Sequence, residues 1–433
     1  MRQTISRPRS IRTTIVPPGD KSISHRAAIL NAIAGGEARV ENFQRSADCL
    51  ATVRCLKLLG CELAWENDTT LRLGGHGLRG LHEPSAVLDC ANSGTSMRLL
   101  SGLLSAQPFF SVLTGDASLR SRPMGRVVEP LRSMGAEIRG REGDTRAPLA
   151  IHGGGLEGIR YRLQVASAQV KSALLLAGLY AEGETLLEEP VQTRDHTERM
   201  LAAMGAAVES GEGLVRIRQQ RGELQPLTMR VPGDISAAAY WLALGALHPD
   251  AEVRVSAVGV NPTRSGVLDA LKTMGADVSI EEERMWGPEP VADVTMRSSR
   301  LRGTVIGGEM VPRAIDELPL LALAACFAEG ETVIRDAAEL RTKESDRIRT
   351  TARELRRLGA EVEERPDGWR IEGPQRLKGA AVSSHGDHRL AMMLAVAGAV
   401  AEGETVIRKA EAVAVSYQRF WRDIEAVIGG GRA

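Results

Sequence analysis

Short polar motifs in this sequence place basic side chains beside hydroxyl groups, an arrangement suited to binding a small anion. The stretch PPGDKSISHRA contains Lys21 and Ser22 side by side, with Arg26 about one helical turn later. An ammonium, a hydroxyl and a guanidinium at this spacing could all contact one phosphate or carboxylate. The stretch is not a phosphate-binding P-loop, which would need glycine at the positions of Ile15 and Asp20.

Two further motifs, NSGTSMR and RSRPMG, combine glycine with arginine. In the first, Gly94 would let a ligand approach the backbone closely, and Arg98 follows one turn later. In the second, Arg122 directly precedes Pro123, which we predict to be the first residue of a helix. Each motif alone also fits an ordinary helix start, where a polar residue caps backbone N–H groups.

The stretch RTKESDRIR adds carboxylates to the cations. We predict that Lys343, Glu344 and Arg347 lie within one helical turn, because their spacing matches neighbours on a helix face. Asp316 is predicted to start a buried helix and is the remaining carboxylate of interest. Such carboxylates could serve as acid and base in proton transfer, although a solvated helix face and a helix cap have the same composition.

An internal repeat shows which elements must position these residues. The pattern L-x-x-(M/L)-G recurs and divides the chain into six repeats of about 70 residues, the last of them degraded. Each glycine follows an amphipathic run and precedes a short alternating stretch, which predicts a surface helix that ends at the glycine and leads into a strand. The glycines are Gly60, Gly135, Gly205, Gly275, Gly359 and Gly429.

Upstream of each surface helix lies a second run, rich in small apolar residues and opened by polar ones. Helices that are apolar on most faces are buried, so we predict one buried helix in each repeat. Lys21, Arg26, Arg98 and Arg389 lie near the starts of these helices, where the positive end of the helix dipole disfavours a cation. An anionic ligand would explain this placement, since helix N-termini bind anions.

The two halves of the sequence also match, because Pro-Gly-Asp recurs about three repeats apart. We therefore predict an α/β protein of two similar domains, each built from three repeats. Glycine at the crossings between domains would absorb changes in backbone conformation. The predicted domains are residues 1–19 with 233–433 and the inserted residues 20–232, with crossings near Gly19 and Gly233.

Composition and charge exclude several classes of function. The chain has 433 residues with equal numbers of basic and acidic side chains and 3% aromatic residues, so it lacks the basic field and stacking surface of a nucleic-acid-binding protein. No uncharged apolar run approaches the roughly 20 residues that span a membrane. Five cysteines without a C-x-x-C pair indicate the reducing cytoplasm. His385 and His388 are spaced like metal ligands but lack a third, so we predict neither a metal nor a cofactor.

In order along the chain, seven motifs resemble signatures of the 5-enolpyruvylshikimate-3-phosphate synthase family: PPGDKSISHRA, NSGTSMRLL, RSRPMG, SAQVKSALLLAGL, TRDHTERML, LRTKESDRI and GDHRLAMMLA. The resemblance implies two domains, each of three βαβαββ units forming an inside-out α/β barrel, with the active site in the interdomain cleft. It implies transfer of the enolpyruvyl group of phosphoenolpyruvate to the 5-hydroxyl of shikimate 3-phosphate. Phosphate leaves after addition and elimination, as a step of aromatic amino acid biosynthesis.

The resemblance also implies roles for individual residues. Asp316 would contact the 5-hydroxyl, Glu344 would be the second proton-transfer carboxylate, and Lys21 would share in catalysis. The residues implied to bind shikimate 3-phosphate are Lys21, Ser22, Arg26, Ser167, Ala168, Gln169, Arg194, Asp316 and Lys343. Those implied to bind phosphoenolpyruvate are Lys21, Gly94, Arg122, Gln169, Arg347 and Arg389.

The chain departs from the family pattern at its C-terminal segment VAVSYQRFW, where Val415 stands about where many members have a lysine. We therefore expect no basic contact to phosphoenolpyruvate from this segment. Gly94 matches members that are sensitive to glyphosate, because tolerant members commonly have alanine there. We expect glyphosate to inhibit this chain in competition with phosphoenolpyruvate.

Two other functions remain open from the sequence. UDP-N-acetylglucosamine enolpyruvyl transferase shares the fold and the donor, but its catalytic cysteine lies on a loop that corresponds to residues 118–124, which contain no cysteine. A non-catalytic anion-binding protein would keep the cations without needing both Asp316 and Glu344. We expect a cytoplasmic monomer whose partners are two small-molecule substrates, without nucleic acid or membrane.

Overall fold

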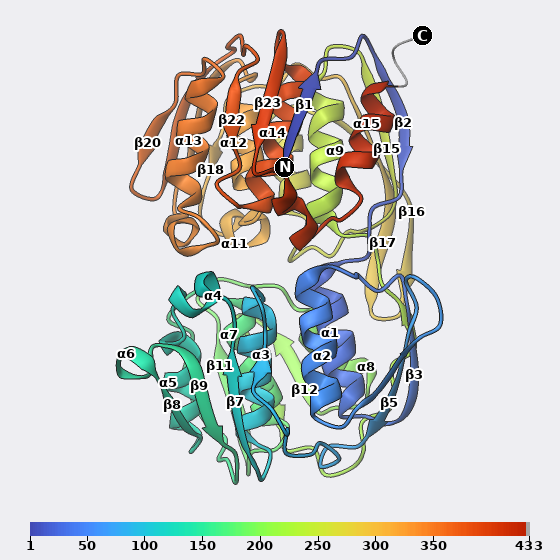
Figure 1. Cartoon of the computed structure of the whole chain (residues 1–433), viewed down its shortest axis with the longest axis vertical. Coiled ribbons are helices and arrows are strands. Elements are labelled where there is room, and N and C mark those ends of the chain that lie inside the picture. Colours follow the sequence, from blue (N-terminus) through green and yellow to red (C-terminus); the bar gives the residue numbers. More distant parts are fainter. Residues whose placement is uncertain (430–433) are drawn as a thin grey trace. The chain divides into compact units, whose positions relative to one another are not determined.

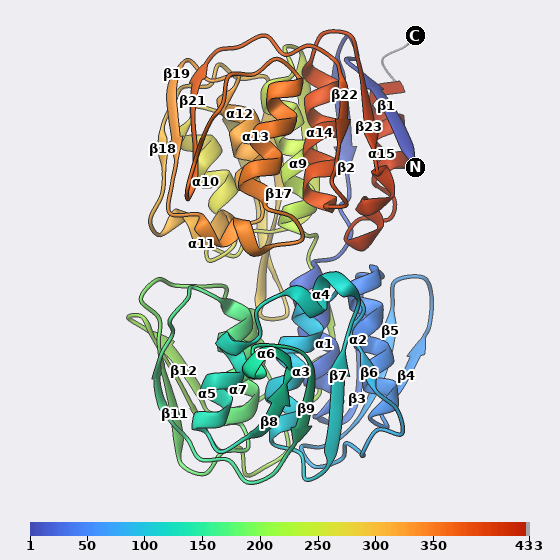
Figure 2. The ribbon, with the colours of Figure 1, turned by 60° about the vertical axis from the view of Figure 1, so that its left-hand side comes forward.

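A computed structural model describes residues 1–429, which form two compact units. Unit 1 comprises Met1–Pro18, Pro232–Arg284 and the chain from Pro290 onward, and unit 2 comprises Gly19–Val231 with Met285–Glu289. Residues 430–433, which the predicted domain boundaries include, lie outside the described residues. In each unit, buried helices lie side by side and strands lie around them (Figures 1 and 2). The mixed α/β architecture predicted from the sequence is confirmed.

The strands of residues 1–429 form three sheets in each unit. In one sheet of unit 2, β6 pairs parallel with β7, which pairs antiparallel with β9, and β8 completes the order β6-β7-β9-β8. A helix connects the two parallel strands, so this repeat has the order βαβαββ along the chain. Its elements are β6 (Leu88–Asp89), α3 (Gly94–Ser105), β7 (Phe110–Thr114), α5 (Gly125–Ser133), β8 (Glu137–Gly140) and β9 (Arg146–His152).

The other two repeats of unit 2 follow the same plan. One consists of β10 (Arg160–Arg162), α7 (Ala168–Gly178), β11 (Glu184–Glu188), α8 (His196–Ala203), β12 (Val208–Gly211) and β13 (Leu214–Arg218). The other consists of α1 (Lys21–Ala32), β3 (Gly35–Glu41), α2 (Ala47–Leu58), β4 (Glu62–Trp65) and β5 (Leu71–His76). Its parallel edge strand is β14 (Met229–Arg230), so the end of the inserted segment completes the sheet that its beginning opens.

Unit 1 repeats this plan with the two ends of the chain. One repeat consists of α9 (Ile235–Leu247), β15 (Ala251–Gly259), α10 (Gly266–Thr273), β16 (Asp277–Trp286) and β17 (Glu289–Arg297), with β2 (Ile11–Ile15) parallel to β15. The next consists of β18 (Val305–Ile306), α12 (Leu318–Ala325), β19 (Gly330–Ile334), α13 (Arg347–Arg357), β20 (Glu363–Arg365) and β21 (Gly368–Gly373). The last consists of β22 (Ala381–Ser383), α14 (His388–Val400), β23 (Glu404–Arg408) and α15 (Phe420–Gly429), and it is completed by β1 (Arg2–Ser6).

The predicted pairing of one buried with one surface helix in each repeat is confirmed. Every residue of α9 and of α14 is buried. Helices α1, α7 and α12 are buried beyond their first turns, and so is α3 except for Arg98. Five of the six repeat glycines have φ between +86° and +100°, a left-handed conformation that lacks a steric penalty only in glycine. These glycines therefore end the surface helices and direct the chain into the next strand.

The divergent C-terminal segment joins the apolar core of unit 1. Tyr417 and Phe420 pack against Trp241 of α9, with ring centroids 6.5 and 5.6 Å from that indole. Val415 ends a short 3₁₀ helix just before them. The segment that carries a lysine in many family members thus contributes aromatic packing here.

Candidate functional site

The N-terminus of α1 brings predicted site residues of unit 2 together. Asp20 accepts a hydrogen bond from a backbone N–H of the first turn at 2.9 Å, which fixes Lys21 and Ser22 at the helix start. The Lys21 ammonium lies 3.1 Å from Asp48 Oδ2, and Arg194 Nη1 donates to Ser22 Oγ at 3.5 Å. An ammonium, a hydroxyl and a guanidinium therefore lie at one helix N-terminus, where backbone N–H groups also favour an anion.

Arg26 lies deeper, at 3% exposure, and connects α1 to α7 and α8. Its Nε donates to Thr197 Oγ1 and its Nη2 to Ser172 Oγ, both at 2.7 Å, while Nη1 donates to the Ser22 carbonyl at 3.0 Å. Burial lowers the pKa of Arg26 to about 10, although the charge of Glu198 acts in the opposite direction. The guanidinium thus fixes the helix end that carries Lys21 and Ser22.

The starts of α3 and α7 are joined through Gln169. Its amide nitrogen donates to Thr95 Oγ1 at 2.9 Å, and its amide oxygen accepts from Arg98 Nη1. Ser167 is the residue before the first turn of α7, and Ala168 is the first helical residue. The predicted residues of the SAQVK motif therefore lie beside those of the NSGTSMR motif.

Arg122 follows the short helix α4 (Ala117–Ser121), and its Nη2 donates to Asn92 Oδ1 at 2.6 Å. The prediction that Pro123 begins a helix is wrong, because α5 begins at Gly125. A residue before proline favours extended backbone, and Arg122 has this conformation, with φ −79° and ψ 149°. The extended residue directs the guanidinium toward the α3 start.

Gly94 lies against both arginines of its neighbourhood. A Cβ at this position would lie 3.0 Å from Arg98 Nη1 and 3.5 Å from Arg122 Nη1. The helix start itself is capped by Ser93, whose Oγ accepts from the Ser96 N–H at 3.1 Å. Glycine thus gives the space in which two guanidinium groups flank a helix N-terminus.

A buried ion cluster links the SAQVK and TRDHT motifs. Lys171, with 1% of its side chain exposed, lies 2.9 Å from Glu189 and 2.6 Å from Glu198, and its Nζ donates to the Thr193 carbonyl at 3.4 Å. Burial raises the pKa of Glu198, while the charge of Lys171 opposes that shift. The cluster holds the backbone that presents Arg194.

Arg347 is the centre of the candidate cluster in unit 1. Its guanidinium is 1% exposed and contacts Asp387 Oδ2 at 2.8 Å, Glu344 Oε2 at 2.7 Å and Asp316 Oδ1 at 3.3 Å. Burial disfavours its charge, but the three carboxylates outweigh burial and raise the pKa of Arg347. The two carboxylates predicted to transfer protons thus share one guanidinium.

Asp316 does not start a buried helix, contrary to the prediction. It lies in the turn between α11 (Met310–Ala314) and α12, which begins at Leu318 with Glu317 as the residue before it. Pro319 explains the difference, because proline lacks an N–H and is accommodated in the first turn of a helix. Asp316 therefore directs its carboxylate to cations rather than to the helix backbone.

Three cation–carboxylate contacts, two made by Asp316 and one by its neighbour Glu317, have no counterpart in the sequence prediction. Asp316 Oδ2 lies 3.9 Å from Arg389 Nη2 and 4.0 Å from Arg264 Nη2. Arg264 in turn binds Glu317 through both terminal nitrogens, at 2.8 and 3.0 Å, and Ser236 Oγ donates to the same carboxylate. A second buried ion pair thus lies beside Asp316.

The prediction of one helical turn through Lys343, Glu344 and Arg347 is wrong. Asp346 accepts a hydrogen bond from the backbone N–H of the first turn at 3.1 Å, and this cap starts the helix at Arg347. Lys343 lies before the cap, and its Nζ donates to Glu339 at 2.8 Å. Glu344 reaches Arg347 from the loop, whereas the ammonium of Lys343 forms an ion pair outside that cluster.

Sequence reasoning missed Asp387, Glu317 and Arg264 as members of the site. Asp387 and Glu317 look like ordinary helix caps in the sequence, and only the fold shows that their carboxylates meet arginines. Arg264 had a usable signal, since it precedes its repeat glycine, Gly275, by the same offset as Arg194 precedes its own. Comparison of the repeats position by position would have found it.

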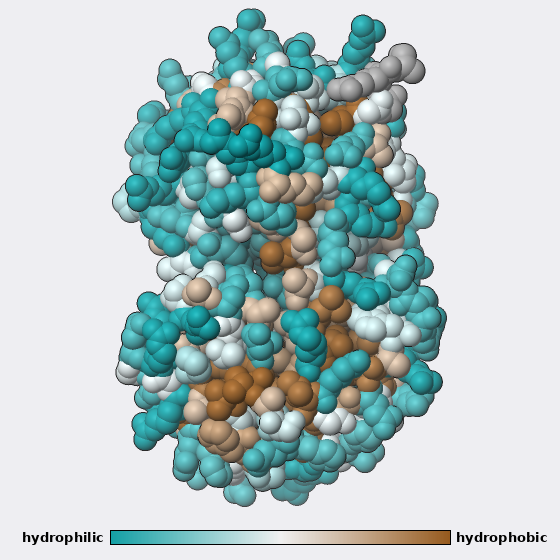
Figure 3. Space-filling view, in the orientation of Figure 1, coloured by the Kyte–Doolittle hydropathy of each residue, from teal (hydrophilic) through white to brown (hydrophobic). Residues whose placement is uncertain are grey.

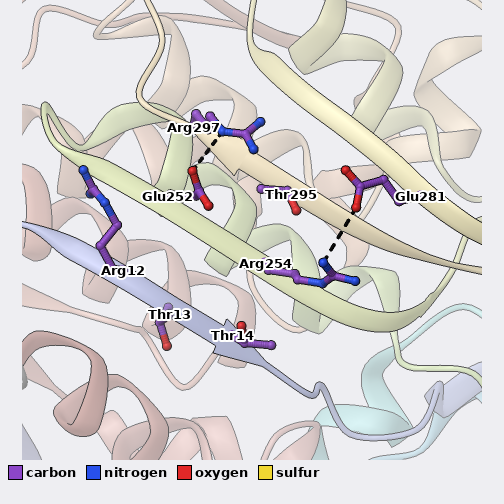
Figure 4. A pocket seen from close by; sticks show the side chains of 8 residues that line it. All are labelled: Arg12, Thr13, Thr14, Glu252, Arg254, Glu281, Thr295 and Arg297. Atoms are coloured by element: carbon purple, nitrogen blue, oxygen red, sulfur yellow. Dashed lines mark hydrogen bonds and ion pairs between the residues drawn. The ribbon is translucent and has the colours of Figure 1, made fainter.

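A shallow hollow of unit 1 lies on the sheet of β16, β17, β15 and β2, and none of its lining residues belongs to the predicted motifs (Figure 4). Arg297 lies 2.9 Å from Glu252, and Arg254 lies 3.7 Å from Glu281. These partly exposed charges neutralise one another, and such surface pairs contribute little free energy. The hollow therefore does not compete with the arginine clusters as an anion site.

Other surface features point to no further kind of site. Figure 3 shows hydrophilic residues over most of the visible face of each unit, with hydrophobic residues between them on unit 2. Among residues 1–429, no helix has the length and apolar character needed to cross a membrane. The same residues contain no group of three or more histidine, cysteine or acidic side chains that could hold a metal.

Comparison with known proteins identifies the family. Residues 5–424 match the protein-family model described as EPSP synthase (3-phosphoshikimate 1-carboxyvinyltransferase). The chain belongs to the EPSP synthase family. The resemblance predicted from the seven motifs is thereby confirmed, and so is the assignment to the transferases.

Relatives match this EPSP synthase family member over their full length. A protein of Herpetosiphon aurantiacus named 3-phosphoshikimate 1-carboxyvinyltransferase is 54% identical over 424 residues, or 98% of each chain. A protein of Roseiflexus castenholzii with the same name is 55% identical over 430 residues, or 99% of this chain and 100% of the relative.

Solved structures share the two-domain fold. The EPSP synthase of Acinetobacter baumannii matches with a TM-score of 0.88 at 44% identity, covering 99% of this chain and 98% of that one. The enolpyruvyl transferase NikO of Streptomyces tendae matches with a TM-score of 0.78 at 19% identity, covering 98% and 96%. The second match shows the fold alone.

Proposed function

We propose that this chain transfers the enolpyruvyl group of phosphoenolpyruvate to the 5-hydroxyl of shikimate 3-phosphate, giving 5-enolpyruvylshikimate 3-phosphate and phosphate. The observation that carries the proposal is the match to the EPSP synthase family over residues 5–424. Each substrate phosphate carries a charge of about −1.5 to −2 at neutral pH. A chain without net charge meets these anions by concentrating cations locally, as at the helix starts of both units.

Proton transfer is assigned to Asp316 and Glu344. In the addition, a base removes the proton of the 5-hydroxyl while an acid protonates the methylene carbon of phosphoenolpyruvate, and the elimination reverses the carbon step. Asp316 is the residue assigned to the 5-hydroxyl, and Glu344 serves the carbon. Their common contact with Arg347 supports the assignment, because one buried guanidinium orients both carboxylates.

Shikimate 3-phosphate is assigned to the α1 and α7 starts of unit 2. Lys21 and Ser22 are adjacent at the α1 start, and Arg194 donates to Ser22 Oγ at 3.5 Å, so an ammonium, a hydroxyl and a guanidinium that suit a phosphate belong to this helix end. Arg26 supports them from inside the unit through its bond to the Ser22 carbonyl. The remaining residues assigned to this substrate are Ser167, Ala168, Gln169, Asp316 and Lys343.

Phosphoenolpyruvate is assigned to guanidinium groups, which pair with carboxylate and phosphate through two parallel hydrogen bonds. In unit 2 these are Arg122, beside Gly94, with support from Gln169 and Lys21. In unit 1 they are Arg347 and Arg389.

The proposed reaction needs no cofactor, because phosphate is the leaving group and side chains move the protons. Each chain contains a complete set of assigned residues, which supports action as a monomer. All five cysteines are unpaired and buried, as suits a reducing compartment, and we assign the chain to the cytoplasm.

A phosphate-release assay on the purified full chain tests the proposal. With phosphoenolpyruvate, addition of shikimate 3-phosphate should release phosphate in step with formation of the enolpyruvyl ether, identified by NMR. Release with UDP-N-acetylglucosamine instead would favour the other enolpyruvyl transferase. Saturable binding of both substrates without release would indicate a non-catalytic anion-binding protein.

A further inference from the structure

Arg264 and Glu317 form a buried ion pair that no step of the proposed reaction uses directly. Their side chains are 4% and 0% exposed, and the guanidinium meets both carboxylate oxygens, at 2.8 and 3.0 Å. Arg264 Nη2 also donates to Ser236 Oγ, which donates to Glu317 Oε1, so this hydroxyl bridges the two charges. Burial opposes both charges, but the charges and hydrogen bonds of the neighbours together outweigh it. Arg264 and Arg389 lower the pKa of Glu317, and Glu317, Asp316 and Asp234 raise the pKa of Arg264.

Each member of the pair also lies near one group assigned to the reaction. Glu317 Oε1 is 3.8 Å from Arg389 Nη1, and Arg264 Nη2 is 4.0 Å from Asp316 Oδ2. Arg389 Nη2 is in turn 3.9 Å from Asp316 Oδ2. Four charges of alternating sign therefore form a closed ring, with one side made of short hydrogen bonds and three sides made of longer contacts.

The unequal sides of this ring have a physical consequence. A buried charge without a partner costs several kcal/mol, so it recruits the nearest opposite charge. Glu317 already has two hydrogen bonds from Arg264, whereas Arg389 lies 3.8 Å away, beyond hydrogen-bonding distance. Arg264 is likewise paired with both carboxylate oxygens of Glu317, and its Nη2 lies 4.0 Å from Asp316 Oδ2.

We propose that Arg264 and Glu317 are positioning residues, whose mutual pairing keeps Arg389 available to phosphoenolpyruvate and Asp316 available for proton transfer. The inference rests on the proposed function, in which Arg389 binds phosphoenolpyruvate and Asp316 contacts the 5-hydroxyl. It predicts that removing either partner releases the other onto a reacting group. Removal of Arg264 should then change mainly KM for phosphoenolpyruvate, and removal of Glu317 should change mainly kcat.

Single substitutions separate the two effects. In Arg264→Met, Glu317 loses its partner and captures Arg389, so KM for phosphoenolpyruvate should rise about tenfold while kcat changes less than about threefold. In Glu317→Gln, Arg264 captures Asp316, so kcat should fall about tenfold with little change in KM. The acidic limb of the kcat profile should also move to lower pH, since a closer cation stabilises the ionised carboxylate.

The double variant Arg264→Met/Glu317→Gln supplies the readout that a merely structural role would not give. With both charges absent, neither Arg389 nor Asp316 has a new partner, so kcat and KM should return to within about threefold of the wild type. Asp293→Asn is the matched control. It removes a carboxylate that binds Arg254 at 2.9 Å on the β16-β17-β15-β2 sheet of the same unit. That variant should leave kcat and KM unchanged.

Thermal unfolding identifies any variant that fails to fold. If Arg264→Met does not fold, the near-isosteric Glu317→Gln and the charge-free double variant still test the inference. A crystal structure of Glu317→Gln should place an Arg264 nitrogen about 3 Å from Asp316. The inference would be overturned if the double variant were no more active than the worse single variant. It would also be overturned if both single variants showed the same fall in kcat and the same rise in KM. An inactive wild type would instead reject the proposed function itself.

Discussion

The candidate cations of the two units differ in their partners. In unit 2, Arg26 and Arg122 donate mainly to hydroxyl and amide oxygens, and Arg194 donates to a serine hydroxyl. In unit 1, Arg347 contacts three carboxylates, and Arg389 lies within 4 Å of two. The contacts described for these cations are thus mainly with neutral oxygens in unit 2, where Lys21 also pairs with Asp48, and mainly with carboxylates in unit 1.

This difference separates the two tasks of the proposed reaction. Neutral partners leave the charge of a guanidinium available to an incoming anion, which favours binding. Carboxylates reduce that attraction but supply groups that accept and donate protons. Substitutions in unit 2 should therefore act mainly on substrate affinity, and substitutions of carboxylates in unit 1 mainly on turnover.

The largest expected effect is on the unit 1 side of this comparison. Asp316→Ala removes the proposed base, so kcat should fall by at least about 10²-fold, the lower range for general acid–base catalysis. Affinity for shikimate 3-phosphate, measured by calorimetry, should stay within about tenfold of the wild type. Near-normal turnover would remove Asp316 from the mechanism, and an equal loss of affinity would erase the contrast between the units.

Arg122→Gln tests the unit 2 side. It removes charge-assisted hydrogen bonds, each worth about 1.5–3 kcal/mol, so KM for phosphoenolpyruvate should rise about tenfold to 100-fold with kcat changed much less. Steady-state kinetics at saturating shikimate 3-phosphate measure both constants. Arg120→Gln is the control, because Arg120 lies two residues earlier, in α4, and donates to the Gly115 carbonyl. A fall in kcat with unchanged KM would place Arg122 in the chemistry.

Glyphosate sharpens the comparison by probing the space beside Gly94. Millimolar glyphosate should inhibit the wild type at low phosphoenolpyruvate, in competition with that substrate. Gly94→Ala should weaken inhibition at least about tenfold, because the added methyl lies 3.0 to 3.5 Å from Arg98 and Arg122. Gly154→Ala, where nothing lies within 4 Å of the added carbon, should leave inhibition unchanged. Full activity of the wild type in millimolar glyphosate would refute the prediction.

The smallest expected effect is a pH-dependent change in the free energy of unfolding that arises from His25 of unit 2. Burial, with the charges of Lys21 and Arg26, lowers the pKa of His25 well below its usual value, and its Nδ1 lies 2.7 Å from Thr52 Oγ1. Below about pH 6.5 the unfolded chain binds a proton at this residue that the folded chain does not, so stability falls as the pH falls.

Urea unfolding between pH 7 and pH 5 measures this loss. His25 should contribute at most about 1.4 kcal/mol of lost unfolding free energy per pH unit, and His25→Gln should remove that contribution. The same substitution at the exposed His76 is the control. An unchanged slope in His25→Gln would show that the histidine binds its proton in the folded chain too.

The repeats explain why much of the fold was predictable from sequence. A glycine in left-handed conformation can end a helix without a Cβ clash, so its recurrence marks each surface helix directly. The long apolar runs similarly indicate buried helices, as α9 and α14 confirm. The pairing of β1 with β23 was not predictable, because strand partners distant in sequence leave no local pattern.

The contacts among the candidate site residues were not predictable from the sequence. The helix boundaries near Asp316 and Lys343 were wrong because Pro319 and the Asp346 cap, both local features, fix where those helices start. The Arg264–Glu317 pair was missed because its members are far apart in sequence. Local sequence does not show which charged side chains are buried, because burial depends on the packing of distant segments around them.

The pairing of β1 with β23 also sets an order in time. Arg2 lies opposite Arg408 and Ser6 opposite Glu404, so the first strand has no partner until nearly the whole chain has been synthesised. At about 5–20 residues per second, that interval is roughly 20–80 s, during which unit 2 leaves the ribosome almost complete. Strand β1 therefore pairs with β23 only after the whole Gly19–Val231 segment of unit 2 has been synthesised.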